Sequence, residues 1–143
     1  MTSQLMLAAD VAFVLGHCRS VAVVGLSRNP ARPSYGVAQY MQAQGWRVIP
    51  INPNETDILG EACYPSLTAA AEHEKFDLVN CFRNSADIPP IVDEAIAIAA
   101  KTGIKAVWLQ LGIRHDAAAA IAEAVGLKVV QDRCLKIEHR LLR

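Results

Sequence analysis

Short runs of β-branched and aliphatic residues alternate along the chain with segments in which apolar residues recur every three to four positions. The runs predict strands at 20–25, 46–51, 77–82, 105–109 and 127–131. The helical spacing predicts helices at 36–44, 67–73, 88–102, 116–125 and 136–142. Such alternation is typical of βαβ units, so we expect an α/β fold, doubly wound, with a mostly parallel sheet of five or six strands and helices on both faces. The expected strand order is 3-2-1-4-5.

Two parts of the chain need separate treatment. Residues 1–19 predict a helix packed on the domain, with Leu7, Val11 and Val14 on its apolar face. The segment 52–74 is less regular, and its residues 60–64 form either a short strand or a turn. Because no linker or repeat interrupts the pattern, we expect one domain over residues 1–143.

Composition changes this picture little, but it excludes several classes of partner. The chain has 143 residues, 52% of them hydrophobic, which is enough for one sizeable core. Its 14 basic and 14 acidic residues give zero formal net charge, so we expect no nucleic-acid partner and no membrane attraction. The sequence contains no signal-peptide pattern and no apolar stretch long enough to span a bilayer, which predicts a cytoplasmic protein.

The four cysteines are widely scattered and form no CxxC pair. This spacing fits neither a disulfide framework nor a zinc site, so we interpret them as reduced thiols. The four histidines lie in different predicted elements, and none is paired at metal-ligand spacing. We therefore expect no metal.

The loop after the first predicted strand is the strongest candidate for chemistry. Gly25 permits a sharp turn there, and the loop leads to Ser34 and Tyr35, just before a predicted helix whose amino end favours an anion. Arg28 and Arg32 lie in this loop, and Arg83 follows another strand. Each arginine alone is an ordinary surface charge, but three at neighbouring strand ends favour a site for several phosphates.

The same loop departs from the dinucleotide-binding fingerprint GxGxxG. Ser27 stands at the second glycine position, and the second predicted strand ends in Asn52 and Pro53 rather than in an acid that would bind a ribose hydroxyl. This disfavours NAD. Glu55 and Asp57 lie close enough in sequence to keep an NAD(P)-binding redox sensor or minor oxidoreductase as the alternative.

No convincing catalytic constellation emerges. Residues 25–29 only partly match the nucleophile elbow GxSxG, because Asn29 takes the last position and Pro30 follows where a helix would begin. We therefore favour a binding module over an enzyme. Two interpretations of Cys134 remain: it is either a buried small residue of the core or a thiol that exchanges with the thiol of a ligand.

Several stretches carry a family resemblance: VAVVGLSRNPARPSYGVAQYM, GWRVIPINPN, LGEACYPSL, FDLVNCFRNSADIPPIVDEAI, AVWLQLGI and GLKVVQDRCLKIEHRLL. In order and spacing they resemble the small stand-alone CoA-binding domain proteins of bacteria, which share a Rossmann-like fold with the CoA-binding domain of succinyl-CoA synthetase. The resemblance runs from about Ser20 to the C-terminus. It implies binding of coenzyme A. With the three arginines and the missing ribose acid, our first hypothesis is a non-catalytic module or sensor that binds coenzyme A or an acyl-CoA and acts on a partner enzyme, with a homodimer as an open alternative.

The resemblance also implies which residues line the ligand. The loop after the first strand would hold the phosphates and adenosine, the next two strand ends would border them, and residues 110–112 would face the pantetheine arm. By position the implied residues are Gly25, Ser27, Arg28, Pro30, Arg32, Ser34, Tyr35, Asn52, Pro53, Phe82, Arg83, Gln110, Gly112 and Cys134.

Overall fold

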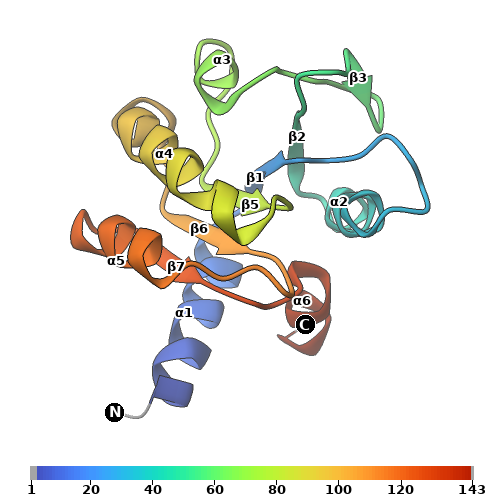
Figure 1. The fold of residues 1–143 in the computed structure, drawn as a ribbon. Coiled ribbons are helices and arrows are strands. Elements are labelled where there is room, and N and C mark those ends of the chain that lie inside the picture. The colour runs from blue at the N-terminus through green and yellow to red at the C-terminus, as the bar shows by residue number, and fades with distance from the viewer. Residues whose placement is uncertain (1–2, 143) are drawn as a thin grey trace.

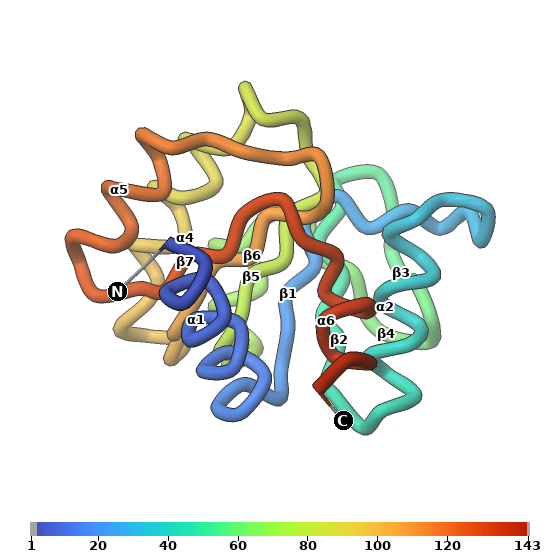
Figure 2. The backbone as a smooth tube through the Cα atoms, turned by 90° about the horizontal axis from the view of Figure 1, so that it is seen from below, coloured from blue at the N-terminus to red at the C-terminus, as the bar shows by residue number. Residues whose placement is uncertain are grey.

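The computed structural model describes residues 3–142 and centres on a parallel sheet of five strands. The strands are β1 (Ser20–Val24), β2 (Arg47–Ile51), β5 (Leu78–Cys81), β6 (Ala106–Leu109) and β7 (Lys128–Val130). Their order across the sheet is β2-β1-β5-β6-β7, and every neighbouring pair is parallel. All carboxyl ends therefore meet at one edge, where Figure 2 shows the connecting loops emerging together.

Helices cover both faces of the sheet (Figure 1). The helices α1 (Ser3–His17), α2 (Pro33–Ala43) and α6 (Leu135–Leu142) pack on one face. The helices α3 (Leu67–Ala71), α4 (Ile88–Thr102) and α5 (Asp116–Ala124) pack on the other. Successive residues of β1 alternate between the two cores, Val21 and Val23 facing α2 while Ala22 faces α4. The predicted doubly wound α/β architecture is confirmed.

The expected strand order 3-2-1-4-5 is wrong for the five predicted strands: the third, predicted at 77–82, is β5 and lies beside β1, and beyond β2 the described chain has only one isolated bridge. Tyr64 pairs with Ile51 in parallel, donating from its amide to the Pro50 carbonyl (3.0 Å) and accepting from the Asn52 amide (2.9 Å). Pro65 follows and has no N–H with which to continue the ladder. A separate two-stranded hairpin, β3 (Asp57–Ile58) and β4 (Glu61–Ala62), precedes this bridge.

Helix α2 begins at Pro33, three residues before the start that we predicted at 36. Proline is favoured at the first helical position because its fixed φ suits a helix and its missing N–H needs no partner there. Ser34 and Tyr35 consequently lie in the first turn of α2 rather than before it. By contrast, α4 has the predicted bounds and ends at Gly103, whose φ of 90° is left-handed.

The cysteines differ in their surroundings. Cys18 and Cys81 are buried in the two cores, and burial raises the pKa of each thiol to about 12. Cys63 and Cys134 are half-buried. Thiolate chemistry at neutral pH is therefore disfavoured at Cys18 and Cys81.

The longest helices that the structure describes, α1 and α4, have 15 residues each. None of the helices within residues 3–142 has the length and apolar character needed to cross a membrane.

Candidate functional site

Two cavities adjoin at the carboxyl edge of the sheet. The larger, of about 650 Å³, lies between the ends of β1, β2 and β5 and the first turns of α3 and α4. The smaller, of about 380 Å³, lies between the loop after β1 and the amino end of α2. Gly25 and Phe82 line both, so the two cavities meet at these residues. Their volumes fall in the range of small-molecule sites.

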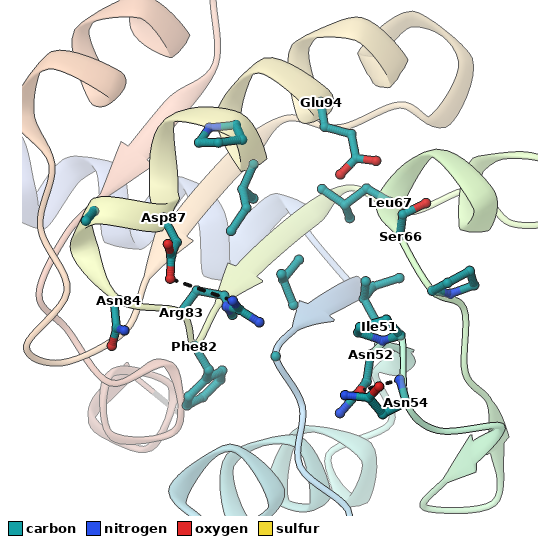
Figure 3. A pocket seen from close by; sticks show the side chains of 17 residues that line it. Ile51, Asn52, Asn54, Ser66, Leu67, Phe82, Arg83, Asn84, Asp87 and Glu94 are labelled. Atoms are coloured by element: carbon teal, nitrogen blue, oxygen red, sulfur yellow. Dashed lines mark hydrogen bonds and ion pairs between the residues drawn. The ribbon is translucent and has the colours of Figure 1, made fainter.

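Most of the predicted site residues line one cavity or the other. Asn52, Pro53 and Arg83 line the larger one. Ser27, Arg32 and Ser34 line the smaller one, together with Gly25 and Phe82. Figure 3 shows Arg83 and Asp87 on one side of the larger cavity and Asn52 and Asn54 on the other. The topology thus gathers residues that lie more than fifty positions apart in sequence.

The loop after β1 is ordered by its own side chains. The Ser27 amide donates to Ser34 Oγ (2.9 Å), the Asn29 amide donates to Ser27 Oγ (3.0 Å), and the Ala31 amide donates to Asn29 Oδ1 (2.9 Å). Such serine and asparagine contacts replace the backbone bonds that a regular element would supply. The loop is therefore held in a set shape next to the smaller cavity.

Replacement of Ser34 by alanine is expected to lower the free energy of unfolding by about 1–2 kcal/mol. The Ser34 side chain is buried, and its loss would leave the Ser27 amide without an acceptor. Urea unfolding of wild type and Ser34→Ala measures the difference. Ser3→Ala at an exposed serine is the control and should stay within about 0.5 kcal/mol of wild type; equal effects at both positions would contradict the role of Ser34.

The three predicted arginines differ in their partners. Arg28 forms ion pairs with Glu55 (3.5 Å) and Asp57 (3.6 Å) and lines neither cavity. Arg83 has one ion pair, from Nη2 to Asp87 Oδ2 at 3.7 Å. Arg32 lines the smaller cavity, and no carboxylate among residues 3–142 lies within ion-pair distance of its guanidinium. Arg32 is therefore the cation most available to an anion.

The start of α2 offers an anion fewer free backbone N–H donors than the sequence suggested. Pro33 has no N–H, the Arg32 amide donates to the Asn29 carbonyl (3.0 Å), and the Tyr35 amide donates to the Arg32 carbonyl (3.1 Å). The Ser34 amide has no acceptor among residues 3–142, so this N–H, the helix dipole and the Arg32 side chain are what this helix end offers an anion.

The remaining predicted residues lie outside both cavities. Gln110 is buried, and its Oε1 accepts from Asn80 Nδ2 (3.3 Å) and from the Leu135 amide (3.4 Å). Gly112 is in a left-handed turn whose amide donates to Asp132 Oδ1 (2.6 Å). Tyr35 and Cys134 pack partly against the core beneath α2 and α6, and Pro30 is exposed in the loop. None of these residues lines either cavity.

The wall of the larger cavity formed by α3 and α4 did not emerge from the sequence. Glu94 Oε2 accepts from the Thr68 amide (3.0 Å) and from Thr68 Oγ1 (2.6 Å), which ties α4 to the start of α3. Ser66 caps α3 by accepting from the Ala69 amide (3.1 Å). The one available signal was the position of Ile91 and Glu94, three residues apart on a helix and so on one face.

No histidine or cysteine of the described chain lines either cavity. Nor do residues 3–142 contain a group of three or more histidine, cysteine, aspartate or glutamate side chains arranged to hold a metal ion. The chemistry that the cavities offer is hydrogen bonding, apolar contact and charge of both signs, because Asp87 and Glu94 line the larger cavity along with Arg83.

Comparisons with known proteins show similarity over most of the chain. The family model described as CoA binding domain matches residues 19–140. The uncharacterized protein YneT of Bacillus subtilis is 31% identical over 135 residues, which cover 94% of this chain and 96% of YneT. The solved structure of a hypothetical protein from Pyrococcus horikoshii superimposes with a TM-score of 0.85 at 32% identity, over 94% of this chain and 92% of that one.

A larger protein shares part of the sequence. Acetate–CoA ligase [ADP-forming] II of Archaeoglobus fulgidus is 32% identical over 89 residues, which are 61% of this chain but only 12% of the ligase. The similarity is therefore confined to a small portion of that ligase.

Proposed function

Because the chain belongs to the CoA binding domain family, we propose that it binds coenzyme A or an acyl-CoA at the carboxyl edge of its sheet. The observation that carries the proposal is the junction of the two cavities at Gly25 and Phe82, with the unpaired Arg32 in the smaller one. An extended ligand with an adenosine and a diphosphate needs an adjoining pair of sites of this kind. Open α/β sheets bind ligands at this edge.

The larger cavity suits the adenosine. Its floor is apolar, formed by Val24, Ile51, Leu67 and Ile91, which offers contact area to a flat base. The side chains of Asn54 and Asn84, which also line it, carry both donors and acceptors for the edge of a base. The diphosphate would then reach the smaller cavity, where the Arg32 guanidinium offers a bidentate match to phosphate oxygens.

NAD(P) is the alternative ligand. The acidic residues that would bind its ribose hydroxyls have other partners in the structure, which weakens the case for it. Glu55 and Asp57 line neither cavity and pair with Arg28. At the end of β2, Asn52 is already engaged, donating from Nδ2 to the Leu26 carbonyl (2.9 Å) and accepting at Oδ1 from the Asn54 amide (2.8 Å). We therefore rank coenzyme A first.

We infer a binding or sensing role rather than catalysis. The Glu94 and Asp87 carboxylates and the Ser66 hydroxyl, which line the larger cavity, already have structural partners: Glu94 bonds Thr68, Ser66 caps α3, and Asp87 pairs with Arg83. A catalytic acid, base or nucleophile must be free to reach a reacting atom. Through its ligand, such a module would report acyl-CoA supply to a partner protein.

Calorimetric titration tests the proposal directly. Coenzyme A and NADH are titrated separately into the purified protein, and then each is titrated in the presence of the other. We expect heat and saturation with coenzyme A and competition by acetyl-CoA. Tight NADH binding without any response to coenzyme A would overturn the proposal in favour of the alternative, and native mass spectrometry of the protein from its own cells would identify a retained ligand independently.

A further inference from the structure

The outward side of α1 carries almost no charge. Asp10 is the only aspartate, glutamate, lysine or arginine in this helix, and it is half-buried in an ion pair with Lys128 (3.8 Å). Leu5 and Met6 are nevertheless 59% and 54% exposed, and Ala9 lies one turn beyond Leu5 on the same exposed side. Figure 1 shows the amino half of α1 extending beyond the other elements. Because a helix that is apolar nearly all round is normally covered on every side, this side has the composition of a protein–protein contact surface.

A groove of about 410 Å³ lies between α1 and α5. Met6 contributes to its apolar wall, and the carboxylates of Glu123 in α5 and Asp132 after β7 line it as well. The arginines that line it, Arg114 and Arg133, pair with carboxylates of their own at 3.0 and 3.8 Å. By contrast, neither Glu123 nor Asp132 forms an ion pair within residues 3–142. The groove therefore combines apolar contact with unpaired negative charge.

Helix α6 has the complementary character and lies on the other side of α1, as Figure 2 shows. Ile137 and Leu141 are 48% and 74% exposed, and their spacing of four residues places them on one face of the helix. Arg140 is exposed beside Leu141, and Lys136 lies over the Tyr40 ring, 5.6 Å from its centroid. In the part of the chain that the structure describes, neither cation has a carboxylate partner. This exposed face of α6 is therefore apolar and basic.

We propose that a second copy of this chain covers α1, with α6 of each copy lying in the groove between α1 and α5 of the other. Arg140 of one copy pairs with Glu123 of the other, while Ile137 and Leu141 pack against Leu5 and its neighbours on α1. The occupant that fits the groove is apolar and basic, as α6 is. Because α6 and the groove flank the same helix, a twofold axis beside α1 forms both contacts at once and closes the dimer.

The proposed dimer leaves the candidate site open. None of the residues of α1, α5 and α6 lines either cavity at the carboxyl edge of the sheet. The inference therefore does not depend on the identity of the ligand, and its failure would leave the proposed function intact.

Sedimentation velocity over a range of protein concentrations tests the proposal. Wild type should reach twice its monomer mass of 15.5 kDa. Glu123→Lys and Arg140→Glu each place like charges together in both contacts of the dimer, and each should raise the dissociation constant roughly tenfold. An equimolar mixture of the two variants should dimerise like wild type. In the mixed dimer the retained arginine faces the retained glutamate, and the two introduced charges face each other.

Asp93→Lys is the matched control, since Asp93 is an exposed carboxylate of α4 on the opposite face of the sheet. It should sediment like wild type. Leu141→Ser should weaken the dimer without any change of charge, and circular dichroism verifies that each variant is folded. A wild type that stays monomeric at millimolar concentration would overturn the inference. So would a dimer that neither charge reversal weakens, or a mixture of the two charge variants that stays dissociated.

Discussion

A double substitution of Arg32 and Arg83 by alanine is expected to weaken coenzyme A binding about a hundredfold, because two charge-assisted contacts to phosphate would be lost together. Arg32 has no competing carboxylate among the described residues, and the Arg83 pair with Asp87 is long at 3.7 Å. Calorimetry on wild type, both single variants and the double variant measures the loss. Wild-type affinity should fall with added salt more steeply than that of the double variant.

The two single variants show which of Arg32 and Arg83 contributes more to coenzyme A affinity. Arg32→Ala should cost more affinity than Arg83→Ala, because a ligand must compete with Asp87 for Arg83 but with no carboxylate for Arg32. Lys101→Ala, which breaks an exposed ion pair with Glu72 at the far end of α4, controls for the loss of one positive charge and should bind like wild type. If the double variant keeps wild-type affinity and an unchanged unfolding midpoint, the smaller cavity is not the phosphate site.

The sequence could not predict that the three arginines differ in their ion-pair partners. Arg28 and Arg32 are four residues apart in one loop, and the pattern of residues treats them alike. Their difference comes from Glu55 and Asp57, which a parallel register and a hairpin bring to Arg28 and not to Arg32. Pairing across such a distance in sequence depends on tertiary structure, which local patterns do not encode.

Helices and strands could be predicted where the spacing of apolar residues and the residues that begin or end an element indicate the same bounds. The helix at 88–102 has both, with prolines in its first turn and a glycine after its end, and α4 has those bounds. Pro33 is an equally good start signal, but in the sequence it looks like part of the polar loop, so α2 begins earlier than expected. The segment 60–64, predicted as a short strand or a turn, contains β4 and the bridge at Tyr64.

The wall of the larger cavity formed by α3 and α4 could not be predicted from the sequence, because the elements before α4 are short. Within the segment 52–74 the sequence predicted only the helix at 67–73, which is α3 (Leu67–Ala71), because the two-residue strands β3 and β4 are too short to show a period. Short elements are stabilised by tertiary contacts such as that between Glu94 and Thr68, rather than by their own propensities. Residues that line a cavity from such elements leave no pattern to detect.

Gly25→Ala is expected to reduce both stability and ligand binding. Gly25 has a left-handed φ of 82°, and a Cβ there would lie 3.0 Å from the Phe82 carbonyl oxygen and 3.1 Å from Arg83 Cδ. The Arg83 side chain can move, but the Phe82 carbonyl belongs to the backbone at the end of β5. We expect a loss of about 2–3 kcal/mol in the free energy of unfolding, a drop in Tm of roughly 5–10 °C.

Gly36→Ala separates this local strain from a general effect of adding a methyl group. Gly36 lies within α2, beside the same loop, and a Cβ there would meet nothing within 4 Å. Because alanine favours a helix over glycine, this variant should gain about 0.5–1 kcal/mol and bind coenzyme A like wild type. Gly25→Ala should lose affinity even at temperatures where it stays folded, since Gly25 and Phe82 join the two cavities. Normal affinity in folded Gly25→Ala would mean that the ligand does not cross this junction.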